Sequence, residues 1–103
     1  MHYYNEEDLS RFGEIARYKP ELFEKFLAWY QACQEEGELT KREKALIGLA
    51  VAVTVQCPYC IDIHSSNARQ AGATAVEMAE TAMVAAALRA GAAVTHATHT
   101  LPD

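Results

Sequence analysis

Apolar residues recur every three or four positions along most of this chain, which is the pattern of helices that bury one face. Glycines, prolines and capping residues divide the pattern into segments at 5–16, 20 to near 37, 40 to about 55, 58 to 72, and 74 to the region of 96. Residues 51–55 are β-branched, but they continue a helical segment without a turn signal, so we predict helix there too. The sequence therefore predicts a compact all-α bundle of about five helices, in a single domain over 1–103.

Residues that cap helices mark the starts of three segments. Thr40 with Glu43, and Thr74 with Glu77, have the spacing of a capping box, in which each side chain accepts a hydrogen bond from the other residue's backbone. Cys57 precedes a proline that suits the first turn of a helix, which places this cysteine at the N-cap. The fourth segment is thus predicted to begin with a thiol at its N-terminus.

Composition limits the compartments and partners that we expect. The net charge is −5 and Lys and Arg form no cluster, which argues against nucleic acid binding. No secretory signal is visible, and the most apolar run, 45–55, is shorter than the roughly 20 residues that span a bilayer. Three cysteines do not suit a secreted disulfide scaffold. We therefore expect a cytoplasmic protein that binds neither nucleic acid nor a membrane.

The candidate chemistry lies in the run QCPYCIDIH, residues 56–64. On a helix beginning near residue 58, Cys57, Cys60 and His64 are three and four residues apart and share one face. The helix N-terminus supplies unpaired N–H groups and a positive dipole, which stabilise a thiolate. His64 can accept the proton of Cys60 or pair with its thiolate as an imidazolium. The spacing predicts a redox-active cysteine pair with an acid–base partner.

Three other interpretations of the cysteine pair fit the sequence less well. Glutaredoxins share the tetrapeptide CPYC, but they have further strands and a cis-proline, whereas the pattern after Cys60 is helical. Structural zinc sites usually need four ligands, and Cys57, Cys60 and His64 supply three without a recognisable second pair. Covalent haem attachment requires a histidine directly after the second cysteine, where Ile61 stands. We expect no metal and no bound cofactor.

The sequence around the cysteine pair resembles the carboxymuconolactone decarboxylase superfamily, in its alkylhydroperoxidase D-like branch. The resemblance rests on the apolar run 46–53, the motif Cys57-Pro-Tyr-Cys60 with His64, and the stretch 71–77. The short length and Tyr-rich start are similar to a peroxidase-like group associated with arsenosugar biosynthesis. The resemblance implies an all-α fold that assembles into trimers or hexamers. True decarboxylases of the superfamily do not depend on a cysteine pair, so the dithiol argues against decarboxylation.

The resemblance also implies an activity, the reduction of hydroperoxides. Electrons would be returned by a dithiol such as dihydrolipoamide, or by a thioredoxin-like protein. By position, Cys60 corresponds to the peroxidatic cysteine, Cys57 to the resolving cysteine and His64 to the proton acceptor.

Two positions depart from the pattern of the resembling hydroperoxidases, Ala45 and Tyr59, and Tyr59 stands where those enzymes can place a histidine between the cysteines. They carry a proton-relay glutamate twelve residues before the first cysteine, and Ala45 stands at that position here. Glu43 and Tyr59 are the candidates for a rerouted relay or for a supporting role. Glu43 is already explained by its capping box, and a phenol is a poor base at neutral pH.

The remaining candidates have ordinary structural explanations. Cys33 is expected to be a buried free thiol on the second helix. His96 and His99 are favoured near a helix C-terminus by the dipole, with a weak metal site as the alternative. The alanine-rich helix from 74 is apolar on most sides, which a domain of this size cannot bury alone, so we expect a homo-oligomer.

Two other functions remain open from the sequence. The first is a disulfide oxidoreductase or redox sensor that shares the dithiol but has little peroxidase turnover. The second is a non-catalytic oligomer whose cavity holds a small ligand or a metal.

Overall fold

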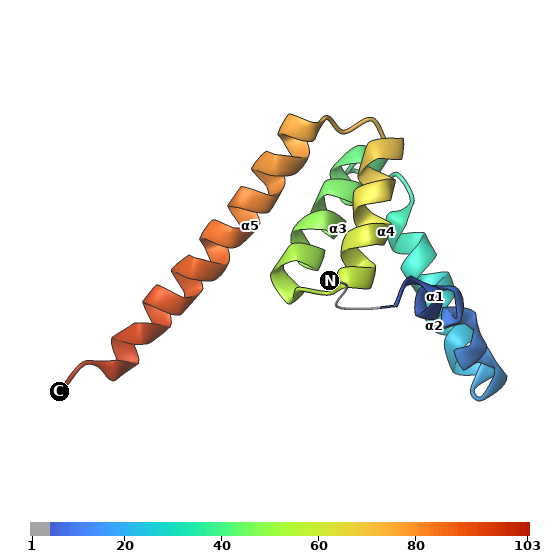
Figure 1. Ribbon diagram of the computed structural model, residues 1–103, viewed down its shortest axis with the longest axis horizontal. Helices are drawn as coiled ribbons and strands as arrows, with labels where there is room; N and C mark the ends of the chain where they lie inside the picture. The colour runs from blue at the N-terminus through green and yellow to red at the C-terminus, as the bar shows by residue number, and fades with distance from the viewer. Residues whose placement is uncertain (1–4) are drawn as a thin grey trace.

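The computed structural model describes residues 5–103, and in that range it contains five α-helices, two 3-10 segments and no strand (Figure 1). The elements in chain order are α1 (Glu6–Ser10), η1 (Phe12–Arg17), α2 (Pro20–Gln34), α3 (Lys41–Val55), α4 (Pro58–Gln70), α5 (Ala75–His96) and η2 (Ala97–Thr100). The predicted all-α class is confirmed. No helix in the described range combines the length and the hydropathy of a membrane span.

Both predicted capping boxes are present. At the start of α3, Glu43 N donates to Thr40 Oγ1 at 3.1 Å and Thr40 N donates to Glu43 Oε1 at 2.9 Å. The same two bonds, at the same distances, join Thr74 and Glu77 at the start of α5. The β-branched end of α3 is helical, and the helix stops at Gln56, whose φ of 58° is left-handed.

Two boundaries differ from the sequence prediction. The first predicted helix is interrupted, because the chain leaves α1 after Ser10 and continues as the 3-10 segment η1, which contains Gly13. Glycine lowers helix propensity and the segment is short, so tighter 3-10 turns compete there. The second helix ends at Gln34 rather than near Gly37. Two glutamates follow Gln34, and negative charge at a helix C-terminus is unfavourable.

The centre of the molecule is α3, which packs against both α4 and α5. The buried apolar residues are small apart from one leucine, and they are Ala45, Leu49 and Ala52 on α3, Ala68 on α4 and Ala85 on α5. Small side chains let the helix backbones approach closely. Arg42 forms an ion pair with Glu77, and Arg89 donates to the backbone carbonyl of Thr54, so polar contacts join α3 to α5 at two places along its length.

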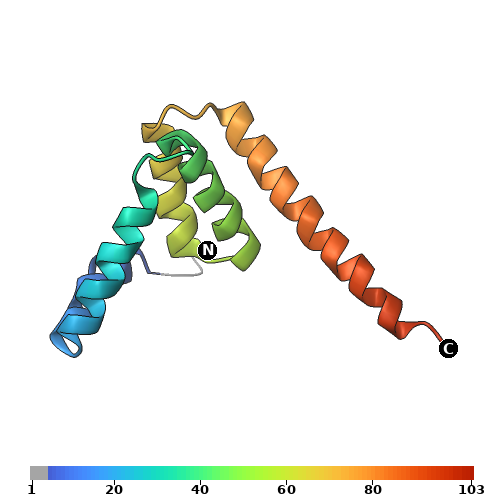
Figure 2. The same ribbon diagram turned by 180° about the vertical axis from the view of Figure 1, so that it is seen from behind.

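The arrangement is open rather than the compact bundle that was expected. Figures 1 and 2 show α5 extending away on one side of the α3–α4 pair and α2 on the other. The radius of gyration is 17.0 Å, against about 13 Å for a compact domain of this length. The physical reason is that the apolar side chains of α5, such as Val76 and Val94, are exposed and have too few helices in this chain to cover them.

Candidate functional site

The cysteine pair occupies the first turn of α4. Cys57 is the N-cap, and its Sγ accepts a hydrogen bond from Cys60 N at 3.3 Å. The Cys60 thiol also donates to this sulfur, and that bond, followed by the backbone N–H of Cys60, lowers the pKa of Cys57. A sulfur therefore takes the place of the usual N-cap oxygen, and the helix start stabilises it as a thiolate.

Cys60 has the opposite tendency. Its thiol donates to Cys57, and this bond, burial and the negative charge of Cys57 together raise the pKa of Cys60. Both thiols are free of a disulfide in this structure. Of the two thiols, Cys57 is therefore the one that loses its proton more readily.

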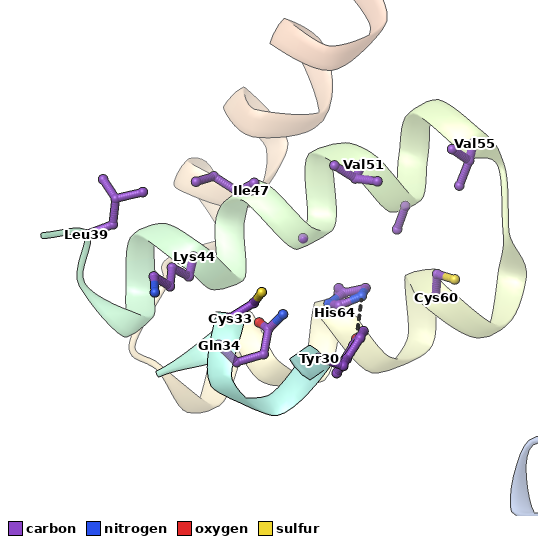
Figure 3. A pocket seen from close by; sticks show the side chains of 12 residues that line it. Tyr30, Cys33, Gln34, Leu39, Lys44, Ile47, Val51, Val55, Cys60 and His64 are labelled. Carbon is purple, nitrogen blue, oxygen red and sulfur yellow. Dashed lines mark hydrogen bonds between the residues drawn. The ribbon is translucent and has the colours of Figure 1, made fainter. Parts of the chain in front are cut away.

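Cys60 and His64 line one cavity of about 410 Å³ between α4, α3 and the end of α2 (Figure 3). Its other walls are mainly apolar and include Leu39, Ile47, Val51 and Val55, with Tyr30, Cys33 and Lys44. Cys57 touches Cys60 at the start of α4 but is not part of this lining. The structure therefore brings Cys60 and His64 to a common cavity, whereas Cys57 contacts Cys60 outside the cavity lining.

The two ring nitrogens of His64 have different surroundings. Its Nε2 is 3.4 Å from the Oη of Tyr30. Its Nδ1 is buried and has no hydrogen-bond partner within the described residues. Burial lowers the pKa of His64, because the charged ring would lose its hydration. The ring is therefore neutral at pH 7 and able to accept a proton.

Residues 20–101 match the model of the carboxymuconolactone decarboxylase family. The chain belongs to that family.

This carboxymuconolactone decarboxylase family member is also similar to other proteins in sequence and in structure. It is 44% identical over 89 residues to the uncharacterised protein 4 in the cox locus of Paracoccus denitrificans, covering 86% of this chain and 80% of that protein. A crystal structure from Methanobacterium thermoautotrophicum matches with a TM-score of 0.80 at 41% identity, over 85% of this chain and 99% of the other. An apo carboxymuconolactone decarboxylase family protein from Legionella pneumophila matches with a TM-score of 0.75 at 33% identity, over 89% and 82% of the chains.

The relay candidates from the sequence do not line the cavity. Glu43 lies at the start of α3, where its hydrogen bonds with Thr40 lower its pKa and account for its position. Ala45, at the position of the usual glutamate, is buried and lines a different pocket beside Asn67. Tyr59 contributes its backbone N–H to the Cys57 sulfur, while its side chain is absent from the cavity lining.

Two features at the cavity were not identified as functional from the sequence. Tyr30 lies on the second helix and was not singled out from the sequence, where only a polar hydroxyl among apolar neighbours could have signalled another role. Cys33 was expected to be buried, but it is exposed and lines the cavity, because the end of α2 covers this side of α3 incompletely.

The His96 and His99 rings lie 4.9 Å apart at an exposed end. No group of three or more potential metal ligands occurs within residues 5–103.

Gly48 of this family member makes room for the imidazole. A Cβ at this position would lie 2.6 Å from His64 Nδ1. We expect Gly48→Ala to force the ring or α3 to move, at a cost of about 1–3 kcal/mol in the free energy of unfolding. Gly91→Ala is the matched control, because Gly91 is also helical but has no atom within 4 Å of such a Cβ.

Urea unfolding of the two variants separates packing from helix propensity. Gly91→Ala should be more stable than the wild type by about 0.5–1 kcal/mol, whereas Gly48→Ala should be less stable. Equal stabilisation of both variants would show that α3 and His64 are not packed as described.

Proposed function

We propose that the protein is a thiol peroxidase of the alkylhydroperoxidase D-like branch, which reduces hydroperoxides with Cys57, Cys60 and His64. The observation that carries the proposal is the arrangement at the start of α4. The Cys57 sulfur, whose pKa is lowered, lies next to Cys60, and Cys60 shares an apolar cavity with the His64 imidazole, whose pKa is lowered. A nucleophile, a base and a second sulfur are the groups that this chemistry requires.

The first step oxidises Cys60. His64 takes the Cys60 proton, and the resulting thiolate attacks the outer oxygen of ROOH. The O–O bond breaks, ROH leaves with the proton from His64, and Cys60 becomes a sulfenic acid. Because the walls of the cavity are apolar, we expect organic hydroperoxides to enter more readily than hydrogen peroxide.

The second step forms the disulfide. The lowered pKa of Cys57 favours its thiolate, which attacks the sulfenic sulfur, and the hydroxide that leaves takes a proton from solvent to become water. A dithiol donor such as dihydrolipoamide or a thioredoxin-like protein then attacks Cys60 from the cavity. Cys57 is the better leaving group because the helix N-terminus stabilises its thiolate.

Stopped-flow kinetics with the reduced protein tests this cycle. In the presence of excess dihydrolipoamide, consumption of an organic hydroperoxide should continue for many equivalents, and peptide mapping should find a Cys57–Cys60 disulfide without Cys33. Consumption of a single equivalent would contradict a peroxidase. It would instead favour a disulfide oxidoreductase or redox sensor, which the absence of a carboxylate at Ala45 also supports.

The dithiol needs a reducing compartment to cycle, which supports a cytoplasmic location.

We also propose that the protein is a homo-oligomer, a trimer or a hexamer. In α5, the residues opposite the buried Ala85 form what we call the outer seam, which is exposed and consists of Val76, Met83, Ala87, Ala90 and Val94. Successive members lie seven, four, three and four residues apart, which is the spacing of helices that pair along a seam. We propose that the outer seam packs against the outer seam of a second copy of this chain.

A further inference from the structure

The cavity beside Cys60 carries one charged side chain within the described residues, and it lies at the end away from the thiol. Lys44 is near the start of α3, whereas Cys60 follows the end of that helix, in the first turn of α4. Figure 3 shows the two side chains at opposite ends of the lining. No aspartate or glutamate of residues 5–103 is part of this lining. The cavity therefore has a cation at one end and the reactive thiol at the other.

The wall between these two ends is aliphatic. Ile47, Val51 and Val55 follow Lys44 at steps of three or four residues, so they share its face of α3. At about 1.5 Å per residue, this face runs for roughly 16 Å from Lys44 to Val55. The three aliphatic side chains are 50%, 55% and 60% exposed in the chain. An apolar chain that lay along them would remove this surface from water, which is favourable.

The Lys44 ammonium is held in place by a bond that does not neutralise it. Its Nζ donates to the backbone carbonyl of Glu35, the C-cap of α2, a contact that lysines often make at the end of a helix. An ammonium has three N–H donors, and this bond uses one of them. Within the described residues Lys44 forms no ion pair, and the Glu35 carboxylate lies 3.9 Å from Lys41 Nζ instead. Capping of α2 thus explains where Lys44 lies and leaves its charge available to a ligand.

The carboxylates near this end of the cavity lie outside it. Glu35, Glu36 and Glu38 belong to the loop after α2, where all three are exposed, and none of them lines the cavity. Water screens exposed charges strongly, so their repulsion of an anion in the cavity is weak. Lys44 is only partly exposed and lines the cavity itself, so an anion at this end would contact it directly.

We propose that the substrate is an organic hydroperoxide with a carboxylate at the far end of an apolar chain, the form that a fatty acid hydroperoxide has. Lys44 binds the carboxylate, the aliphatic face of α3 covers the chain, and the hydroperoxide group reaches Cys60. The choice of substrate rests on the proposed peroxidase function, but the binding of the carboxylate does not. Because Lys44 contacts the end of the substrate that does not react, its contribution is equal in the ground state and the transition state. It should therefore lower KM and leave kcat unchanged.

A comparison of linoleic acid hydroperoxide with its methyl ester tests this proposal. The two substrates share the chain and the peroxide and differ in the charge at the far end. With dihydrolipoamide as reductant, and below the concentration at which either forms micelles, KM should be about tenfold lower for the acid, as a charge-assisted hydrogen bond predicts. Salt at about 1 M should remove most of this preference, because it screens the ammonium. Equal KM values at low salt would overturn the proposal while leaving the protein a peroxidase.

Variants of Lys44 assign the preference to this side chain. Lys44→Met should raise KM for the acid about tenfold and leave kcat and the kinetics of the ester unchanged. Lys44→Arg should keep the preference because it keeps the charge. Lys41→Met is the matched control, since Lys41 lies one turn earlier on α3 and does not line the cavity, and it should behave as the wild type. If Lys44→Met slowed the acid and the ester alike, its effect would be on the fold and the proposal would be wrong.

Calorimetric titration with laurate separates this proposal from the peroxidase function. Laurate has the carboxylate and the chain but no peroxide, so it should bind the reduced wild type about tenfold more tightly than methyl laurate does, and Lys44→Met should lose that difference. If laurate binds in this way and no hydroperoxide is consumed, the carboxylate site stands and the proposed function fails. If the protein consumes hydroperoxides but laurate and methyl laurate bind equally, the carboxylate site is wrong.

Discussion

Replacing Cys60 by serine should abolish peroxide turnover, whereas replacing Cys57 should leave a single oxidation. A serine hydroxyl is far less nucleophilic than a thiol, so Cys60→Ser should lose more than about 10³-fold in rate, as expected for the loss of a nucleophile. Cys57→Ser keeps Cys60 and His64 on the cavity but has no second sulfur to close the disulfide. Its Cys60 should therefore stop as the sulfenic acid, which mass spectrometry can detect after trapping with dimedone.

Cys33→Ser is the matched control for this pair. Cys33 lines the same cavity but does not contact the first turn of α4 by a hydrogen bond that the structure records. Its replacement should leave turnover and the disulfide unchanged. Loss of turnover in Cys33→Ser would show that the exposed thiol takes part in the cycle.

The low pKa of Cys57 makes one contrary outcome informative. The pKa of Cys57 is lowered and that of Cys60 is raised, so a thiolate forms more readily on Cys57 than on Cys60. If that thiolate reacts with peroxide directly, Cys57→Ser should be inactive and Cys60→Ser should accumulate the sulfenic acid. This reversed pattern would overturn the roles implied by the family resemblance while leaving the dithiol itself as the redox centre.

Local signals predicted the parts of the fold that depend on neighbouring residues. The capping boxes of Thr40 and Thr74 were predicted because their partners lie three residues away in the chain. The N-cap position of Cys57 followed in the same way from the proline after it. The start of the candidate site was therefore predictable, because α4 itself sets the geometry of the two sulfurs.

Contacts between distant segments were not predictable in this way. Tyr30 is 34 residues from His64, and nothing in the sequence specifies that α2 brings it to the imidazole. The space for the ring depends on Gly48, whose role is visible only when α3 packs against α4. The compact bundle was expected because apolar segments were assumed to cover one another. The structure instead leaves the apolar face of α5 exposed, since no other helix of the described residues covers it.

A glutamate in the outer seam should dissociate the proposed oligomer. Met83 lies near the middle of the seam and is 69% exposed in the single chain. Burial of such a side chain contributes about 1.5–3 kcal/mol, and every copy loses that contribution in Met83→Glu. The charge must also be buried without a partner or the contact must open. Sedimentation velocity should show an oligomer for the wild type and a monomer for Met83→Glu, while the volume-conserving Met83→Leu should remain assembled.

Thermal unfolding adds a test that does not depend on the size measurement. If assembly stabilises the fold, the melting temperature of the wild type rises with protein concentration, because association favours the folded state by mass action. In Met83→Glu the melting temperature should be lower and independent of concentration. A monomeric wild type, or a melting temperature that does not depend on protein concentration, would mean that α5 is stable with its apolar face in water. The small core centred on Leu49 and its neighbouring alanines would then have to support the fold alone, which its limited buried area makes difficult.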